Sequence, residues 1–195
     1  MQAIQQNVIT AAVLPTRRAV VTVALVVGFA LFIAATAQIR IPLPGTPVPI
    51  TGQTLGVLLT GAALGSVAGT TSLLLYISLG AVGLPFYAGG TSGWDSLTGA
   101  TFGYFVGFIV AAWVVGWFSE HRRDRVVRTA VPAFIAGSLI IYAFGVGWLW
   151  LTVFPDLGTS ISKGMTPFLI GDTIKAVLAG LLLPGTWWLV DRSKA

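Results

Sequence analysis

The sequence predicts an all-α integral membrane protein with six membrane-spanning helices and both termini in the cytoplasm. Its 195 residues are 55% hydrophobic and 9% charged, whereas soluble domains carry about 25% charged residues. Several apolar runs are long enough to cross a bilayer. Basic residues gather beside these runs at 17–18, 122–128 and 192–194, and such patches indicate the cytoplasmic side.

The first predicted span covers residues 19–37, which as a helix would rise roughly 28 Å, close to the hydrocarbon thickness. It contains two pairs of small residues at helical spacing, Ala24 with Gly28 and Ala30 with Ala34. Such pairs let helices approach closely in lipid. Ala30 and Ala34 are therefore candidates for docking onto a partner helix, and packing inside the subunit is the alternative.

Residues 38–52 are predicted to form a stiff apolar lid over a cavity. Four of the ten prolines fall between 42 and 49, and proline removes backbone donors and fixes φ, which argues against a helix. The segment also carries Ile41, Leu43, Val48 and Ile50. We therefore expect it to cover apolar structure rather than extend into water.

Residues 53–84 predict two short helices, 53–65 and 67–84, with a break near Gly65 and Ser66. One helix of the combined length would rise about 48 Å, too long for a single span, and glycines such as Gly61 weaken it. Two spans also place the basic patch at 122–128 on the cytoplasmic side, where basic loops belong.

The remaining predicted spans of this single membrane domain are 99–118, 130–153 and 167–190. The loop over 85–98 mixes glycines, which allow close approach to a ligand, with aromatic residues. These aromatics supply either flat apolar walls or an interfacial belt. The loop over 154–166 is polar and is expected outside.

The last span contains an acid and a base, Asp172 and Lys175, whose spacing places both on one face of the helix. Thr166 and Pro167 are typical of a helix start. Either charge facing lipid would cost about 2.5–3.5 kcal/mol, so both are expected to face protein, water or a ligand. The alternative is an internal ion pair that only holds helices together.

Residues required for several other functions are missing from the sequence. The chain has no cysteine and one histidine, His121, which leaves no His/Cys metal cluster and no histidine base inside a span. No Walker A motif is present. The formal charge of +5 lies mostly beside the spans, which argues against nucleic-acid binding. We therefore predict no enzyme, no metal and no cofactor, and a small neutral-to-anionic ligand held by Asp172, Lys175 and the amide of Gln53.

Four segments, in order along the chain, resemble the BioY family: Gln38–Leu59, Gly80–Gly90, Gly99–Phe108 and Gly171–Lys175. The proline-rich first segment is the most specific of them. The loop over 85–98 departs from the family pattern because it contains neither Asn nor Arg.

The resemblance implies a six-helix S-component fold, meaning the substrate-binding membrane subunit of an energy-coupling-factor (ECF) transporter in a prokaryotic cytoplasmic membrane. It implies high-affinity biotin binding and uptake. The implied partners are biotin, a transmembrane coupling subunit and two ATP-binding-cassette ATPases, with membrane lipid around the subunit. An S component for another vitamin, or a structural membrane subunit without a ligand, remain the alternatives.

The resemblance also implies roles for particular residues. The Asp and Lys of the family's sixth helix correspond to Asp172 and Lys175, and Asp172 would accept hydrogen bonds from the ureido N–H groups of biotin. Lys175 would contact either the ureido oxygen or the carboxylate. S components resembling this one use an Ala-x-x-x-Ala surface on the coupling subunit, which here is Ala30 and Ala34. The other candidate ligand contacts are Gln53, Phe86, Tyr87, Gly89 and Tyr104.

Overall fold

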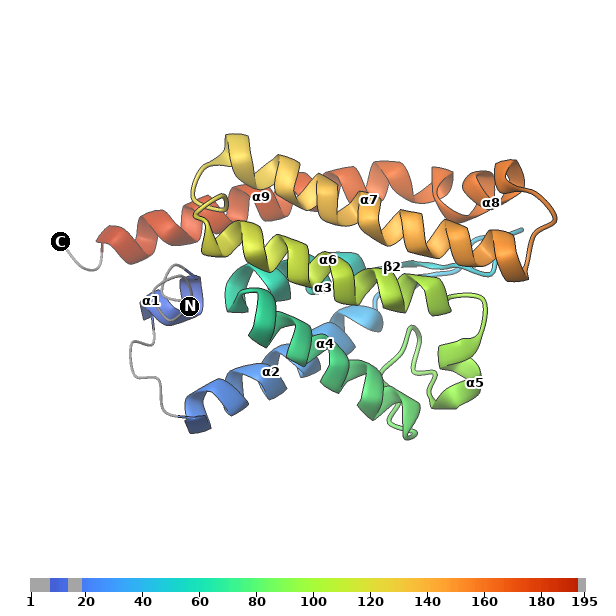
Figure 1. Cartoon of the computed structure of the whole chain (residues 1–195), viewed down its shortest axis with the longest axis horizontal. Helices are drawn as coiled ribbons and strands as arrows, with labels where there is room; N and C mark the ends of the chain where they lie inside the picture. Colours follow the sequence, from blue (N-terminus) through green and yellow to red (C-terminus); the bar gives the residue numbers. More distant parts are fainter. Residues whose placement is uncertain (1–7, 14–18, 193–195) are drawn as a thin grey trace.

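The computed structural model describes residues 8–13 and 19–192, which form helices and one short β-hairpin (Figure 1). The basic residues predicted to mark the cytoplasmic side at 17–18 and at Lys194 lie outside the described residues. In chain order the elements are α1 (Ile9–Val13), α2 (Ala19–Ala37), β1 (Arg40–Ile41), β2 (Ile50–Thr51), α3 (Gln53–Leu64), α4 (Ser66–Ala81), α5 (Gly93–Thr98), α6 (Phe102–Glu120), α7 (Val127–Thr152), α8 (Leu157–Gly164), a 3-10 turn (Thr166–Phe168) and α9 (Leu169–Arg192).

Within the described residues, four helical segments have the length and apolarity needed to cross a membrane. The helices α3 and α4 are apolar but shorter. The chain is therefore a mostly helical, multi-pass membrane protein. The four long segments are Ala19–Ala37, Phe102–Glu120, Val127–Thr152 and Leu157–Val190.

The break between α3 and α4 lies at Gly65, as the sequence predicts. Gly65 has φ +85°, which L side chains rarely adopt, and this conformation ends α3. The next residue starts α4, and both the backbone N–H and the hydroxyl of Ser66 donate to Oε1 of Glu120, at 2.8 and 2.9 Å. A Cβ on Gly116 would lie 2.5 Å from the backbone at this break. Helix α6 therefore passes directly against the break and supplies the carboxylate that caps α4.

The inward face of α2 corrects the prediction of a partner-docking surface at Ala30 and Ala34. These residues are 1% and 6% exposed, because α2 packs on α3 and α4 along this side. The small pair serves packing inside the subunit, which was the alternative. The other small pair of the helix, Ala24 and Gly28, lies on the exposed side.

The proline-rich segment forms a two-stranded antiparallel hairpin in which Arg40 lies opposite Thr51. The loop that connects the two strands extends to α8. There the hydroxyl of Thr46 donates to the carbonyl of Lys163 at 2.9 Å. The hairpin is therefore attached at its base to α2 and α3 and at its tip to α8.

Two segments predicted as loops contain short helices. Helix α5 lies within 85–98, and α8 lies within 154–166. Asp156 caps α8 by accepting from the backbone N–H of Thr159 at 2.8 Å, and this bond lowers the pKa of the Asp156 carboxyl. Asp is a preferred helix N-cap residue, so Asp156 could have predicted α8. The polar composition of the segment favoured a loop instead.

The connection between α6 and α7 is anchored to α9 by a polar contact. Trp187 donates from Nε1 to Oδ2 of Asp124 at 2.8 Å, and the guanidinium of Arg125 lies 3.9 Å from the centre of the Trp187 ring. Burial raises the pKa of the Asp124 carboxyl, and the Trp187 bond opposes that effect. The basic segment is thus held against the helices at this end.

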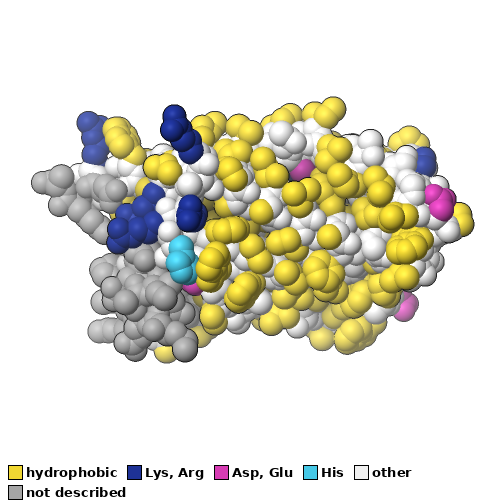
Figure 2. Space-filling view, turned by 45° about the horizontal axis from the view of Figure 1, so that its top comes forward, with side chains coloured by type: hydrophobic (Ala, Val, Ile, Leu, Met, Phe, Trp, Pro, Cys, Tyr) yellow, Lys and Arg dark blue, Asp and Glu magenta, His cyan; other side chains and the backbone are white. Residues whose placement is uncertain are grey.

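Polar and apolar side chains are separated along the length of the molecule. Figure 2 shows hydrophobic side chains over the middle of the visible face and most of the visible Lys and Arg side chains at one end. In Figure 1 this is the end with the α6–α7 connection, and the hairpin and α8 lie at the other end. The exposed arginines of the basic end are Arg122, Arg123, Arg128 and Arg192.

Candidate ligand-binding site

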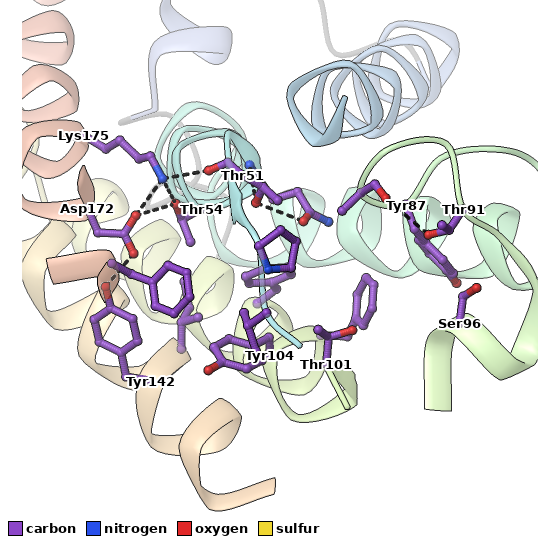
Figure 3. A pocket seen from close by; sticks show the side chains of 18 residues that line it. Thr51, Thr54, Tyr87, Thr91, Ser96, Thr101, Tyr104, Tyr142, Asp172 and Lys175 are labelled. Carbon is purple, nitrogen blue, oxygen red and sulfur yellow. Dashed lines mark hydrogen bonds and ion pairs between the residues drawn. The ribbon is translucent and has the colours of Figure 1, made fainter. Parts of the chain in front are cut away.

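A cavity of about 80 Å³ lies at the hairpin end of the helices. Its walls come from the hairpin, from the start of α3, from the segment between α4 and α6, and from α6, α7 and α9. In Figure 3 the charged residues Asp172 and Lys175 lie at one side of the cavity, and Tyr87, Thr91 and Ser96 lie at the other.

The charged side is built around an ion pair. Nζ of Lys175 lies 2.7 Å from Oδ1 of Asp172, and it also donates to the carbonyl of Thr51 at 2.7 Å and to the hydroxyl of Thr54 at 3.0 Å. The other carboxylate oxygen, Oδ2 of Asp172, accepts from the hydroxyl of Tyr142 at 2.6 Å. The pair therefore joins the hairpin, α3, α7 and α9 in one network (Figure 3).

Local structure explains why these groups meet. Asp172 stands in the first turn of α9, where the helix dipole favours a carboxylate, and Lys175 follows on the same face. Thr51 ends the hairpin and is joined to α3 through Gly52, whose added Cβ would lie 2.6 Å from the carbonyl oxygen of Thr36. This close approach to α2 holds the hairpin end beside the charged pair.

The middle of the cavity is apolar, and it suits a flat ring system because several of its walls are aromatic. Tyr104 also lines it and donates from its hydroxyl to the carbonyl of Gly164 at 2.6 Å, so its polar end is occupied. The apolar lining residues include Val48, Pro49, Phe105, Phe108, Ile141 and Phe168.

The far side of the cavity carries hydroxyl groups without charge. It is lined by Tyr87, Thr91, Ser96 and Thr101. Tyr87 is 2% exposed and donates from its hydroxyl to the carbonyl of Ile77 at 2.6 Å, and burial raises its pKa.

Five of the seven candidate contacts from the sequence line the cavity. Gln53 is among them, although both ends of its amide already have partners. Its Nε2 donates to the hydroxyl of Tyr76 at 2.7 Å, and its Oε1 accepts from Thr51. The lining candidates are Gln53, Tyr87, Tyr104, Asp172 and Lys175.

Phe86 and Gly89 are not among the residues that line the cavity, and their contact with a ligand stays a prediction. Phe86 packs against the edge of the buried core while its neighbour Tyr87 turns inward. Gly89 has φ +71°, and a Cβ there would lie 2.8 Å from Cδ of Arg40. Its role is to let the Arg40 side chain lie close over the loop.

Sequence reasoning missed the polar partners of the charged pair. Tyr142 lies within a long apolar helix, where a tyrosine resembles any other large core residue. A phenol that far from the ends of a span needs a buried acceptor, and this was the one available signal. Nothing in the sequence marked Thr51 and Thr54 as site residues except that they lie within two positions of Gln53.

The fold and the cavity together define a class: membrane-embedded proteins that hold a small molecule between helices near one end of the bundle. Among solved structures, the chain is similar to the S-component for biotin from an ECF-type ABC transporter. The TM-score is 0.78 with 26% sequence identity, over 85% of this chain and 89% of that one.

The family model described as the BioY family matches residues 6–192, and the chain belongs to this family. It is 40% identical to a biotin transporter BioY of Rhizobium etli over 144 residues, which are 70% of this chain and 76% of that protein. It is also 40% identical to a biotin transporter BioY of Thermotoga maritima over 154 residues, 79% of this chain and 88% of that protein.

The ion pair can be tested by a double-mutant cycle that measures stability. Asp172→Ala leaves the Lys175 ammonium without its anion and should lower the free energy of unfolding by about 3 kcal/mol, the lower end of what removing one partner of a buried pair costs. Lys175→Ala should do likewise. The double variant should recover much of the loss, since no unpaired charge remains.

Melting temperatures of the wild type and the three variants in detergent measure this cycle. Asp95→Ala is the matched control, because Asp95 is exposed and its loss should leave the melting temperature almost unchanged. A double variant that loses as much stability as both single variants added together would show that the two residues act independently.

Proposed function

We propose that the chain is the biotin-binding S component of an ECF transporter and takes up biotin across the cytoplasmic membrane of a prokaryote. It is a transport subunit and not an enzyme, as membership of the BioY family implies. The observation that supports the ligand best is the Asp172–Lys175 pair at one end of an apolar, aromatic cavity.

The chemistry of biotin matches this arrangement. Its ureido group offers two N–H donors and one carbonyl acceptor, its fused rings are apolar, and its tail ends in a carboxylate. We place the ureido group against Asp172 and Lys175, where a carboxylate accepts from N–H and an ammonium donates to the carbonyl. The rings then lie between Tyr104 and the aromatic walls, and the tail extends toward Thr91 and Ser96.

Binding requires the cavity to widen. Its volume of about 80 Å³ is below the ~300–1,000 Å³ typical of ligand pockets. The hairpin is one of the walls that are not helical, and at its tip the hydroxyl of Thr46 donates to the carbonyl of Lys163 in α8. We propose that the hairpin lifts to admit the ligand and then covers it.

The biotin affinity of the Asp172 and Lys175 variants shows whether the pair binds the ligand or only holds the helices together. Asp172→Ala and Lys175→Ala should each weaken biotin binding at least tenfold, because a buried ligand loses a hydrogen bond to a charged group, roughly 1.5–3 kcal/mol. In the double variant stability should recover while affinity stays low. Equilibrium binding of radiolabelled biotin to the purified proteins measures both points.

The same assay separates the alternatives. Near-native biotin affinity in the double variant would reject the site assignment. A wild-type subunit that ignores biotin and binds another vitamin would be an S component of different specificity, and one that binds no vitamin would be a structural subunit.

For the topology, we propose six spans with both termini in the cytoplasm, which counts α3 and α4 as two short spans. The basic end supports this orientation, since it carries Arg122, Arg123 and Arg128 and basic loops remain inside. The cavity and hairpin then face outward, where the substrate arrives. In this arrangement α3 and α4 are shielded from lipid in part by α2 and α6, which pack on both.

Single cysteines test the orientation, because the native chain has none. Ser162→Cys in α8 should react with an impermeant maleimide added to intact cells, since Ser162 is exposed at the hairpin end. Val126→Cys, which replaces a side chain 55% exposed at the basic end, should react only after permeabilisation. Labelling of Val126→Cys in intact cells would reverse the proposed orientation.

For the coupling subunit and the two ATPases, we propose docking through the exposed side of α2. An apolar hollow of about 450 Å³ lies between α2, α3 and α9 and includes Ala24 and Gly28. A Cβ on Gly28 would meet nothing within 4 Å. The backbone of α2 is therefore open to close approach by a helix of the partner.

Gly28→Trp should block ATP-driven biotin uptake in cells that supply the coupling subunit and ATPases, and leave biotin binding by the purified subunit intact. Gly185→Trp is the matched control, because Gly185 is also exposed with nothing within 4 Å of an added Cβ but lies on α9. If both variants transport normally, the coupling subunit docks elsewhere.

A further inference from the structure

The proposed ligand brings a negative charge that the cavity does not balance. Among the described residues that line the cavity, Lys175 and Asp172 are the charged ones, and they neutralise each other. In the proposed pose Lys175 serves the ureido end of the ligand, and its charge is balanced by Asp172 at 2.7 Å. A carboxylate tail therefore needs another cation, and the loop over 85–98 contains no Lys or Arg.

Arg40 stands beside the cavity on the hairpin. It lies directly opposite Thr51 in the antiparallel pair, and residues opposite each other project on the same face of a sheet. Thr51 lines the cavity. Arg40 and Thr51 therefore project on the same face of the hairpin, and one of the two lines the cavity.

The side chain of Arg40 lies over Gly89, next to residues that line the far side of the cavity, although Arg40 does not line the cavity itself. An added Cβ on Gly89 would lie 2.8 Å from its Cδ and 2.9 Å from its Nη1, so the guanidinium lies over Gly89. The preceding residues Tyr87 and Ala88 line the cavity, as does Thr91 two positions after Gly89. These are the residues toward which the ligand tail extends when the ureido group lies at Asp172.

The N–H donors of the Arg40 guanidinium are not used within the described part of the chain. It forms no hydrogen bond or ion pair with any residue in the part of the chain that the structure describes, and the residue is exposed. A guanidinium presents paired N–H donors that match a carboxylate. The second outer cation, Lys163, has its Nζ 3.1 Å from an added Cβ on Gly45, at the hairpin tip.

We propose that Arg40 binds the carboxylate of the ligand at the mouth of the cavity. This rests on the proposed function, since it takes biotin as the ligand. Arg40 thereby selects an anionic tail, whereas Asp172 and Lys175 select the ureido end. The hydroxyl of Ser96 lies on the same side as a further donor, and that of Thr91 would have to exchange its 3.4 Å bond to the carbonyl of Ala88.

The test compares biotin with biotinamide, its uncharged amide, in equilibrium binding to the wild type, Arg40→Gln and Lys163→Gln. Arg40→Gln should weaken biotin binding about fivefold, the scale of a partly exposed ion pair, and leave biotinamide binding unchanged. Because salt screens exposed charges, the preference of the wild type for biotin should also fall as salt is added, and this dependence should vanish in Arg40→Gln. Lys163→Gln should behave as the wild type.

The outcomes separate the two proposals. If the wild type binds neither compound, the proposed function fails. If it binds biotin but Arg40→Gln weakens both compounds equally, Arg40 holds the loop in place and does not bind the carboxylate, and the inference is overturned. Unchanged biotin affinity in Arg40→Gln would overturn it as well.

Discussion

The structure depends on one constraint, the burial of a carboxylate and an ammonium among apolar helices. A lone charge there would be strongly unfavourable, so the Asp172–Lys175 pair has to be neutralised and hydrogen-bonded where it lies. The partners come from three other parts of the chain: the hairpin end at Thr51, the first turn of α3 at Thr54, and the middle of α7 at Tyr142. The pair consequently sets where the hairpin, α3, α7 and α9 meet, and that meeting point is one end of the cavity.

The two ends of the molecule are built differently. At the basic end, Glu120 caps α4, α6 passes against the break at Gly65, and Trp187 binds Asp124. At the other end, the hairpin and the segment between α4 and α6 complete cavity walls that also include α6, α7 and α9. The hairpin that we propose to lift for the ligand lies at the same end as the polar network that would exchange its hydrogen bonds.

The sequence predicted well those features that follow from a residue's own chemistry. Apolar length predicted the long helices, a glycine at a positive φ marked the α3–α4 break, and the spacing of Asp172 and Lys175 placed them on one face. Sequence reasoning failed where a property, such as the burial of one helix face, depends on which other helix packs against it. A helix that is apolar all round has no polar face to show its orientation, so the buried pair Ala30 and Ala34 was indistinguishable from the exposed pair Ala24 and Gly28. Tyr142 was missed for the same reason, since a large residue in an apolar setting does not reveal whether it points into a cavity.

The central claim is that the charged pair exchanges part of its internal network for the ureido group of biotin. A crystal structure of the subunit with biotin tests it most directly. The account predicts ureido nitrogen atoms within hydrogen-bond distance of Asp172, with the carboxylate tail directed to the side of Thr91 and Ser96. Biotin bound elsewhere, with the contacts of Asp172 to Lys175 and Tyr142 unchanged and no ligand atom near them, would contradict it.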